Sequence, residues 1–361
     1  MFSSSRQTLK YLHHVSASST QAKRHLASIA PGILQAKPLS PSFGAEVDGI
    51  DWSRPLAPEV VREIVQLQNK WGVLVFRTTG LTDTTHVQYS KNFGALETAH
   101  AMNKPRRASL PQLYDAGNLG PDDKIIPQFS RAWWHTKGNG LWHTDSSFHQ
   151  HRSSYSALRA VELPPVGGQT KYADMRAAYL GLPNDIKERI ENLVAEHWIW
   201  HSRKLAAPQE FDKPTDGEKA TLPPAYHKLV QIAPDGINKT LYIASHARRI
   251  LGMADSESTS LIKILLDHAQ QPQYQVTVKW KNVGDLVQWD NRCTMHRATA
   301  FQDQSNRRDM RRTTIHDHGP GAFGVKNLLS ADDIDIRAGG KIDISEGATP
   351  ETQTQEQILA M

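Results

Sequence analysis

Apolar residues recur with the period of an α-helix in four parts of the chain. Residues 58–70 show this spacing most clearly, and a proline stands at their start, where the first turn of a helix tolerates it. Residues 82–93 begin with a threonine–aspartate pair suited to capping and end before Gly94. Residues 256–270 have a polar start and an aliphatic face. We predict helices over these three ranges and, from a weaker pattern, over residues 185–196.

Short apolar stretches elsewhere have the length and alternation of β-strands. The clearest covers residues 274–280, where aromatic and β-branched side chains alternate with polar ones. We predict further strands over residues 73–76, 155–161, 170–173, 241–244 and 286–289. Many short strands with helices gathered mostly early indicate a mainly β fold with flanking helices, a sandwich or jelly roll. The sequence has neither alternating βαβ units nor a glycine-rich phosphate loop, which argues against a nucleotide-dependent enzyme.

The 361 residues are enough for one large domain or two small ones. The sequence has no internal repeat, and neither of its more polar stretches separates two regions that could each form a core. We therefore predict one domain over residues 39–318, preceded by a leader at 1–38 and followed by an extension at 319–361. Residues 204–224, rich in proline, lysine and acidic residues, are expected to form a surface loop.

The charge of the chain is concentrated in its leader. Lysine and arginine number 42 against 37 acidic residues, and five of the basic residues but no acidic one precede Glu46. The rest of the chain is neutral, which excludes a basic nucleic-acid binder. Residues 1–30 have the composition of a mitochondrial transit peptide and equally of a disordered tail, so we predict a mitochondrial or cytoplasmic protein. No apolar run approaches the roughly 18 residues of a membrane span, and the single Cys293 excludes a disulfide framework.

A histidine and an aspartate two residues apart, His143 and Asp145, are the first candidates for metal ligands. In an extended segment their side chains point the same way and can grip one ion. A third ligand from elsewhere would complete the facial triad of non-haem Fe(II) oxygenases, with three positions left open. The pair alone is weak evidence, because 17 histidines and 37 acidic residues produce such a spacing by chance. A further histidine, His296, follows the predicted strand 286–289.

Four arginines stand in residues 307–314. If this segment is a strand, Arg308, Met310, Arg312 and Thr314 share one face. Two guanidinium groups on one face could each hold a carboxylate bidentately, which suits a dicarboxylate co-substrate and an anionic substrate. A solvated basic edge strand that resists aggregation is the alternative.

Five blocks in order along the chain resemble the Fe(II)/2-oxoglutarate-dependent dioxygenases of the taurine and 2,4-dichlorophenoxyacetate dioxygenase family. The blocks are residues 141–148, 167–170, 174–179, 284–292 and 307–314. The resemblance extends from about residue 39 to about residue 317. The 2,4-dichlorophenoxyacetate branch is the nearest, because residues 146–148 and 174–179 are especially similar to it.

The resemblance implies a double-stranded β-helix whose iron is held by His143, Asp145 and His296. It also implies Fe(II), 2-oxoglutarate and O2 as cofactor and co-substrates, with succinate and CO2 as products. Thr170 and one arginine of the pair Arg307 and Arg308 would bind the distal carboxylate of 2-oxoglutarate. Between the two arginines we choose Arg308, because its spacing to Arg312 keeps the pairing of the family; Arg307 remains the alternative.

On the substrate side the resemblance is less specific. It implies a small organic acid, with Arg312 facing its acidic group or assisting the co-substrate, and with Asn118, His100 and Lys104 near the pocket. Hydroxylation beside an ether oxygen would cleave the ether. Alternatives are a sulfonate, a purine or a natural-product intermediate as substrate, a non-catalytic binding module, and a zinc hydrolase with the same three ligands. Family members often form homo-oligomers, which makes one possible here.

Overall fold

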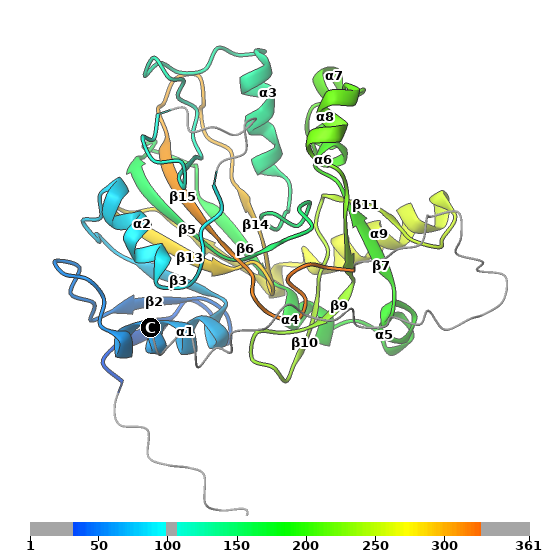
Figure 1. Ribbon diagram of the computed structural model, residues 1–361, viewed down its shortest axis with the longest axis horizontal. Helices are drawn as coiled ribbons and strands as arrows, with labels where there is room; N and C mark the ends of the chain where they lie inside the picture. Colours follow the sequence, from blue (N-terminus) through cyan, green and yellow to red (C-terminus); the bar gives the residue numbers. More distant parts are fainter. Residues whose placement is uncertain (1–31, 99–106, 326–361) are drawn as a thin grey trace, which may run out of the picture. The chain divides into compact units, whose positions relative to one another are not determined.

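The computed structural model describes residues 32–98 and 107–325, and all structural statements concern those residues. The chain divides into two units, Met1–Ile33 and Leu34–Met361, and the second holds nearly all of the described residues. This second unit is built around two β-sheets (Figure 1). Its first strand begins at Gln35, so the predicted domain start at residue 39 falls just after that strand.

The larger sheet has seven strands, and its centre combines segments far apart in the sequence. β13 lies between β3 and β5, and β5 pairs on its other side with β15. Every pairing in the sheet is antiparallel except that of β2 with β3. In order across the sheet the strands are β1 (Gln35–Pro38), β2 (Ala45–Asp48), β3 (Val73–Phe76), β13 (Leu286–Asp290), β5 (Ser153–Glu162), β15 (Asp309–His316) and β4 (Tyr114–Asp115).

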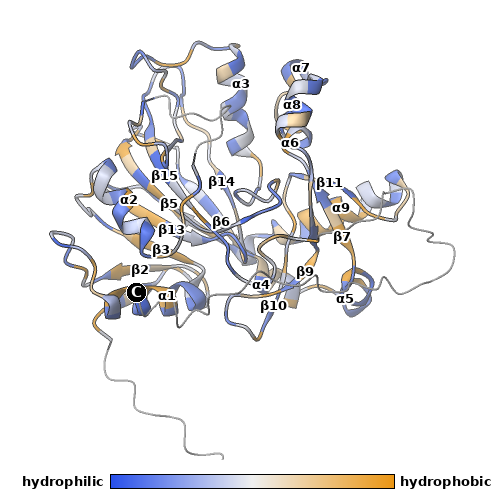
Figure 2. Ribbon diagram, viewed as in Figure 1, coloured by the Kyte–Doolittle hydropathy of each residue, from blue (hydrophilic) through white to orange (hydrophobic). Residues whose placement is uncertain are grey.

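A smaller antiparallel sheet packs on one face of the larger one. It consists of β12 (Gln275–Val278), β6 (Thr170–Asp174) and β14 (Thr294–Ala298). Val287 and Trp289 of β13 join Tyr172 and Val278 from the smaller sheet in one buried apolar cluster. Figure 2 shows hydrophobic residues along β5 and β13. Two sheets that bury each other's apolar faces form a sandwich of the jelly-roll type, so the predicted fold class is confirmed.

Two helices cover the opposite face of the larger sheet. α1 (Pro58–Trp71) and α2 (Asp83–Lys91) bury Ile64 and Tyr89 in a cluster with Leu74 and Leu286 of the sheet. Successive strand residues point to opposite faces, which is why Leu286 packs under the helices while Val287 packs between the sheets. Both predicted helices are confirmed, although α2 ends at Lys91, earlier than predicted.

The turn that ends α1 depends on a glycine. Gly72 has φ +69° and follows the last helical residue, and a Cβ there would lie 2.9 Å from the Phe43 ring. Gly80 also has a positive φ, +67°, but nothing lies within 4 Å of the position of its Cβ. We expect Gly80→Ala to lower the free energy of unfolding by about 1 kcal/mol through backbone strain alone. Gly72→Ala should cost about 1–3 kcal/mol more, because the ring must shift. Equal losses in chemical denaturation would contradict this.

The remaining elements surround the smaller sheet or follow it. α4 and α9 form an apolar cluster with the outer side of β6. In chain order these elements are α3 (Arg131–Lys137), η2 (Gly138–Gly140), α4 (Met175–Leu180), α5 (Asn184–Ile190), β7 (Val194–His197), α6 (Ile199–Ala206), α7 (Pro208–Phe211), α8 (Asp216–Thr221), β8 (Ala225–Lys228), β9 (Val230–Ile232), β10 (Lys239–Leu241), β11 (Ala247–Ile250), α9 (Asp255–Ala269) and η3 (Pro272–Tyr274).

Three predictions of secondary structure were wrong in part. The helix expected over residues 185–196 ends at Ile190, because β7 pairs with both β8 and β11 and buries all four of its residues. The loop expected over residues 204–224 contains α7 and α8, the latter started by a capping box between Thr215 and Glu218. The strand expected over residues 241–244 ends at Leu241, where residues 242–244 continue as buried chain outside the ladder.

No helix among the described residues is long and apolar enough to cross a membrane. The predicted leader lies almost entirely outside the described part of the chain, as does most of the predicted C-terminal extension.

Candidate metal centre and co-substrate site

His143, Asp145 and His296 come together at the edge of the smaller sheet. His143 and His296 form an antiparallel bridge, with backbone N–H to carbonyl distances of 3.0 and 2.8 Å. Asp145 follows two residues after His143, and its carboxylate oxygens lie 4.0 Å from His143 Nε2 and 3.8 Å from His296 Nε2. One ligand atom from each residue lies within 4.8 Å of the others, and all three residues are buried.

Hydrogen bonds orient the first two ligands. His143 Nδ1 lies 2.7 Å from the carbonyl oxygen of Leu141, which fixes the proton on Nδ1. Nε2 then has no proton, and its lone pair can bind a metal ion at the centre. The Asp145 carboxylate accepts a hydrogen bond from Ser156 Oγ at 2.8 Å. Asn291 accepts from the backbone N–H of Asp145 at 3.2 Å and donates to Ser156 at 2.9 Å. Rotation of Asp145 would therefore break several contacts at once.

Two aromatic rings from the core hold the third ligand. The ring centroid of His296 lies 4.6 Å from that of Trp289 and 6.0 Å from that of Tyr172. Trp289 Nε1 also donates to Asn291 Oδ1 at 2.9 Å. Sequence reasoning assigned no role to Ser156, Asn291, Trp289 or Tyr172. The available signal was position, because Asn291 and Trp289 stand in one of the family blocks and Tyr172 shares a strand face with Thr170.

The protonation states suit a divalent metal. Burial lowers the pKa of His143 and takes that of His296 well below its usual range, so both imidazoles are neutral. Burial raises the pKa of the Asp145 carboxyl, but Arg312 and the two histidines outweigh it and the pKa is lowered overall. Two neutral imidazoles and a carboxylate form the donor set of non-haem Fe(II) sites. These residues therefore fit iron without having to lose a proton.

Arg308 is a buried cation without an acidic partner. No carboxylate of the described residues lies within ion-pair distance of it, and its guanidinium donates to the carbonyl oxygens of Gly168 at 3.3 Å and Ala116 at 2.8 Å. Burial lowers its pKa to about 10, and the nearby Tyr172 and Asp309 oppose that shift. A buried guanidinium that lacks a counter-ion is expected to bind an anion.

The turn before β6 is shaped around this arginine. Gly168 has φ +63°, and a Cβ there would lie 3.1 Å from Arg308 Nε. Two residues further on, Thr170 opens β6, and its buried hydroxyl accepts a hydrogen bond from Trp280 Nε1 at 3.2 Å. Thr170 and Arg308 thus belong to the same corner of the fold, as the sequence predicts.

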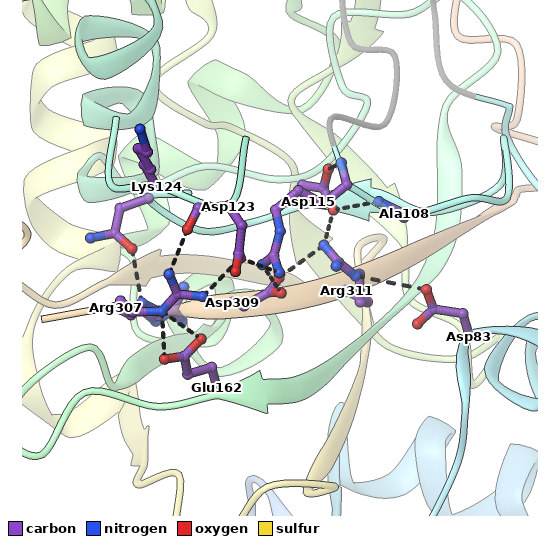
Figure 3. A network of polar contacts seen from close by, with 12 residues as sticks. Asp83, Ala108, Asp115, Asp123, Lys124, Glu162, Arg307, Asp309 and Arg311 are labelled. Atoms are coloured by element: carbon purple, nitrogen blue, oxygen red, sulfur yellow. Dashed lines mark hydrogen bonds and ion pairs between the residues drawn. The ribbon is translucent and has the colours of Figure 1, made fainter. Parts of the chain in front are cut away.

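The arginines on either side of Arg308 already have acidic partners (Figure 3). Arg307 is part-exposed and pairs with Glu162 and Asp123, both at 2.8 Å. Arg311 pairs with Asp115 and, at 2.8 Å, with Asp309. This network leaves Arg308 as the guanidinium in residues 307–311 that has no carboxylate partner among the described residues.

Arg312 points to the metal centre. Its Nη1 donates to Asp145 Oδ1, and its guanidinium lies 4.8 Å from the centre of the Tyr114 ring. Met310, on the same strand face, packs between the two sheets. Met310 and Arg312 of the predicted face therefore point inward, whereas Arg308 stands just before the strand.

Asn118 is buried and supports Arg308. Its carboxamide accepts from the backbone N–H of Arg308 at 2.8 Å and donates to the carbonyl oxygens of Asp303 and Asn306. These contacts use the polar atoms of its side chain, so the structure gives no support to the predicted contact with substrate. The other two predicted substrate residues, His100 and Lys104, lie outside the described residues.

Fold and site together define a class. A jelly roll that holds two histidines and one aspartate at one sheet edge, with a buried arginine that has no carboxylate partner in the described part of the chain, is a non-haem iron oxygenase scaffold. Residues 35–314 match the family model described as "Taurine catabolism dioxygenase TauD, TfdA family". The chain belongs to this family and is a 2-oxoglutarate-dependent dioxygenase that uses Fe(II), 2-oxoglutarate and O2.

Two curated relatives and one solved structure are similar over most of the chain. The alpha-ketoglutarate-dependent 2,4-dichlorophenoxyacetate dioxygenase of Cupriavidus pinatubonensis is 38% identical over 78% of this chain and 97% of its own length. The (S)-phenoxypropionate/alpha-ketoglutarate-dioxygenase of Sphingobium herbicidovorans is 35% identical over 76% and 91%. The crystal structure of AAD-2 in complex with Mn(II) and N-oxalylglycine has a TM-score of 0.72 and 38% identity, over 78% and 97%.

Proposed function

We propose that this dioxygenase hydroxylates an aryloxyalkanoic acid at the carbon between the ether oxygen and the carboxylate. The product of phenoxyacetate would be a hemiacetal, which splits into a phenol and glyoxylate. Similarity to relatives named for 2,4-dichlorophenoxyacetate and phenoxypropionate supports this choice. The observation that carries it in the structure is the clustering of the buried His143, Asp145 and His296 with inward-facing arginines.

We assign residue roles on the same basis. His143 and His296 would bind Fe(II) through Nε2, and Asp145 through one carboxylate oxygen. Bound iron supplies the activation of O2, coupled to conversion of 2-oxoglutarate to succinate and CO2. Arg308 and Thr170 would hold the distal carboxylate of 2-oxoglutarate. Arg312, already bonded to Asp145, would assist the co-substrate at the metal or face the acidic group of the substrate.

The chain's own residues orient the metal ligands and exclude water from the site. Trp289, Tyr172 and the apolar cluster between the sheets exclude water behind the metal. Ser156 and Asn291 keep the Asp145 carboxylate from rotating. His143 is held by a backbone bridge to His296 of β14, which restrains it more than an unpaired loop would.

A direct assay tests the proposed function. The full chain, loaded anaerobically with Fe(II) and 2-oxoglutarate, should show the visible charge-transfer band of a chelated keto acid. With O2, phenoxyacetate should give succinate, phenol and glyoxylate in equal amounts, and 2-phenoxypropionate should give phenol as well. The Asp145→Ala variant serves as the blank. Succinate released with taurine but not with the aryloxy acids would replace our substrate class with the sulfonate alternative.

Two further proposals rest on composition and on the family alone. We propose a mitochondrial or cytoplasmic location, because residues 1–30 have the composition of a transit peptide and equally of a disordered tail. Fusion of residues 1–38 to a fluorescent protein distinguishes these locations. We also propose a homo-oligomer, which light scattering of the purified chain tests.

A further inference from the structure

Arg203 of α6 is pressed against the turn that leads into the metal ligands. Its Nη1 donates to the carbonyl oxygen of His135 at 2.5 Å. The same nitrogen fills the place that a Cβ on Gly138 would take, so the helix η2 accepts the arginine because it has a glycine there. Leu141, whose carbonyl oxygen orients His143, follows this turn directly. Arg203 therefore packs against the turn that immediately precedes the segment of the iron ligands His143 and Asp145.

A second chain of contacts leads from α6 to the metal centre. The hydroxyl of Ser202, next to Arg203, lies 2.8 Å from Nδ1 of His246. The ring of His246 lies 6.1 Å from that of the ligand His143 and 4.9 Å from that of Phe148, measured between centroids. The middle of α6 is thus connected through His246 to the ligand His143, and the Phe148 ring lies beside that connection.

Arg203 has no counter-ion among the described residues, in contrast to the other cations of this region. Lys204 pairs with Asp212 at 2.5 Å, Arg131 with Glu210 at 2.7 Å and Arg248 with Glu196 at 2.5 Å. Within the described chain, no carboxylate lies within 4.0 Å of the Arg203 guanidinium, and its buried Nε has no hydrogen-bond acceptor. Burial lowers the pKa of Arg203, and the nearby Tyr114 opposes that shift.

The other cationic groups around the centre already have a role or no charge. Arg308 faces the corner of Gly168 and Thr170, and Arg312 is bonded to Asp145. Burial takes the pKa of His246 well below its usual range, so its imidazole is neutral and cannot supply a positive charge. Among the described residues, Arg203 is therefore the cation near His143 that has no anionic partner.

We propose that Arg203 binds the carboxylate of the primary substrate and so selects acids over neutral molecules. Phe148 and Trp134 pack against the same apolar cluster of α6 and α7, so an aromatic ring attached to that carboxylate would find aromatic neighbours. This inference rests on the proposed function, because it names the residue that recognises its substrate class.

Equilibrium binding separates this role from a structural one. Wild type, Arg203→Met and Arg203→Lys are each loaded anaerobically with Fe(II) and 2-oxoglutarate, and the charge-transfer band is titrated with phenoxyacetate or with neutral phenoxyacetamide. Loss of a charged hydrogen bond should weaken phenoxyacetate by roughly 10- to 100-fold in Arg203→Met. Phenoxyacetamide should bind all three proteins alike, and Arg203→Lys should recover part of the loss. Lys204→Met, one residue along the same helix, should behave as wild type.

The 2-oxoglutarate band shows that each variant is folded and loaded before substrate is added. Unchanged binding of phenoxyacetate to Arg203→Met, or equal weakening of acid and amide, would overturn the role of Arg203 while leaving the proposed function intact. If wild type forms the band but binds no aryloxy acid, the proposed substrate class is wrong and the inference fails with it. If Arg203→Met does not form the band, Arg203→Lys decides, because it keeps the charge but not the bidentate geometry.

Discussion

Asp145→Ala is expected to abolish iron binding and turnover and to leave the jelly roll folded. The carboxylate contributes the one negative ligand, and without it two neutral imidazoles face the positive Arg312. Loss of a partner that only orients a ligand costs about 10- to 100-fold, so loss of the ligand itself should exceed that range. Anaerobic Fe(II) titration and succinate release measure both effects.

The matched control is Asp235→Ala, which removes a carboxylate from an exposed turn that holds Asn238. It should bind iron and release succinate as wild type does. His143→Ala should resemble Asp145→Ala, because it removes the Nε2 that the Nδ1 contact with the Leu141 carbonyl orients toward the centre. Full activity in either ligand variant would refute the metal site.

Arg308→Met is expected to raise the requirement for 2-oxoglutarate by roughly 10- to 100-fold, the value of a charged hydrogen bond in a buried site. Arg308 is buried and has no acidic partner among the described residues, so its charge is available to a carboxylate. Titration of the charge-transfer band measures the affinity directly, and the KM for 2-oxoglutarate gives the same comparison during turnover.

Arg307→Met, one residue away, provides the matched control. Arg307 forms ion pairs with Glu162 and Asp123 at the surface. A surface ion pair contributes about 0–1 kcal/mol to the free energy of unfolding. We expect its 2-oxoglutarate affinity to stay within about 2-fold of wild type. The reverse pattern, with Arg307→Met impaired and Arg308→Met normal, would transfer the role to Arg307.

The iron ligands show how much of the metal site can be predicted from local sequence. A spacing of two residues places His143 and Asp145 on one side of an extended segment, and this holds whatever the rest of the fold does. His296 is far away in the chain, and its place beside His143 depends on a bridge between two segments. Its role could be read from the sequence only through resemblance to a family.

The choice between Arg307 and Arg308 shows what pattern alone leaves open. Neighbouring residues of an extended chain point to opposite sides, so a one-residue difference decides between surface and interior. The register of β15 against β5 sends Met310 and Arg312 inward, and Arg308, which stands just before the strand, is buried as well. The ion pairs of Arg307 confirm that it points the other way.

The same limit explains the helix that ended early. Residues 185–196 have a helical pattern, but β7 gains two strand partners and full burial, a tertiary interaction that outweighs local preference. The role proposed for Arg203 could not be predicted from the sequence for a related reason. It depends on the lack of a nearby carboxylate among the described residues. A sequence shows which charges exist but not which of them lie close together.

By itself, the sequence determined the mainly β fold, the two early helices, the His143 and Asp145 pair and, through resemblance, the dioxygenase family. These features depend on spacings within a few residues or on sequence blocks in the order of the family. Both can be recognised without knowing which residues are in contact. The tertiary structure alone decided which arginine is buried without a partner and which polar groups hold the ligands. Pairing of charges and hydrogen bonds is a property of distance in space, and only the assembled sheets set those distances.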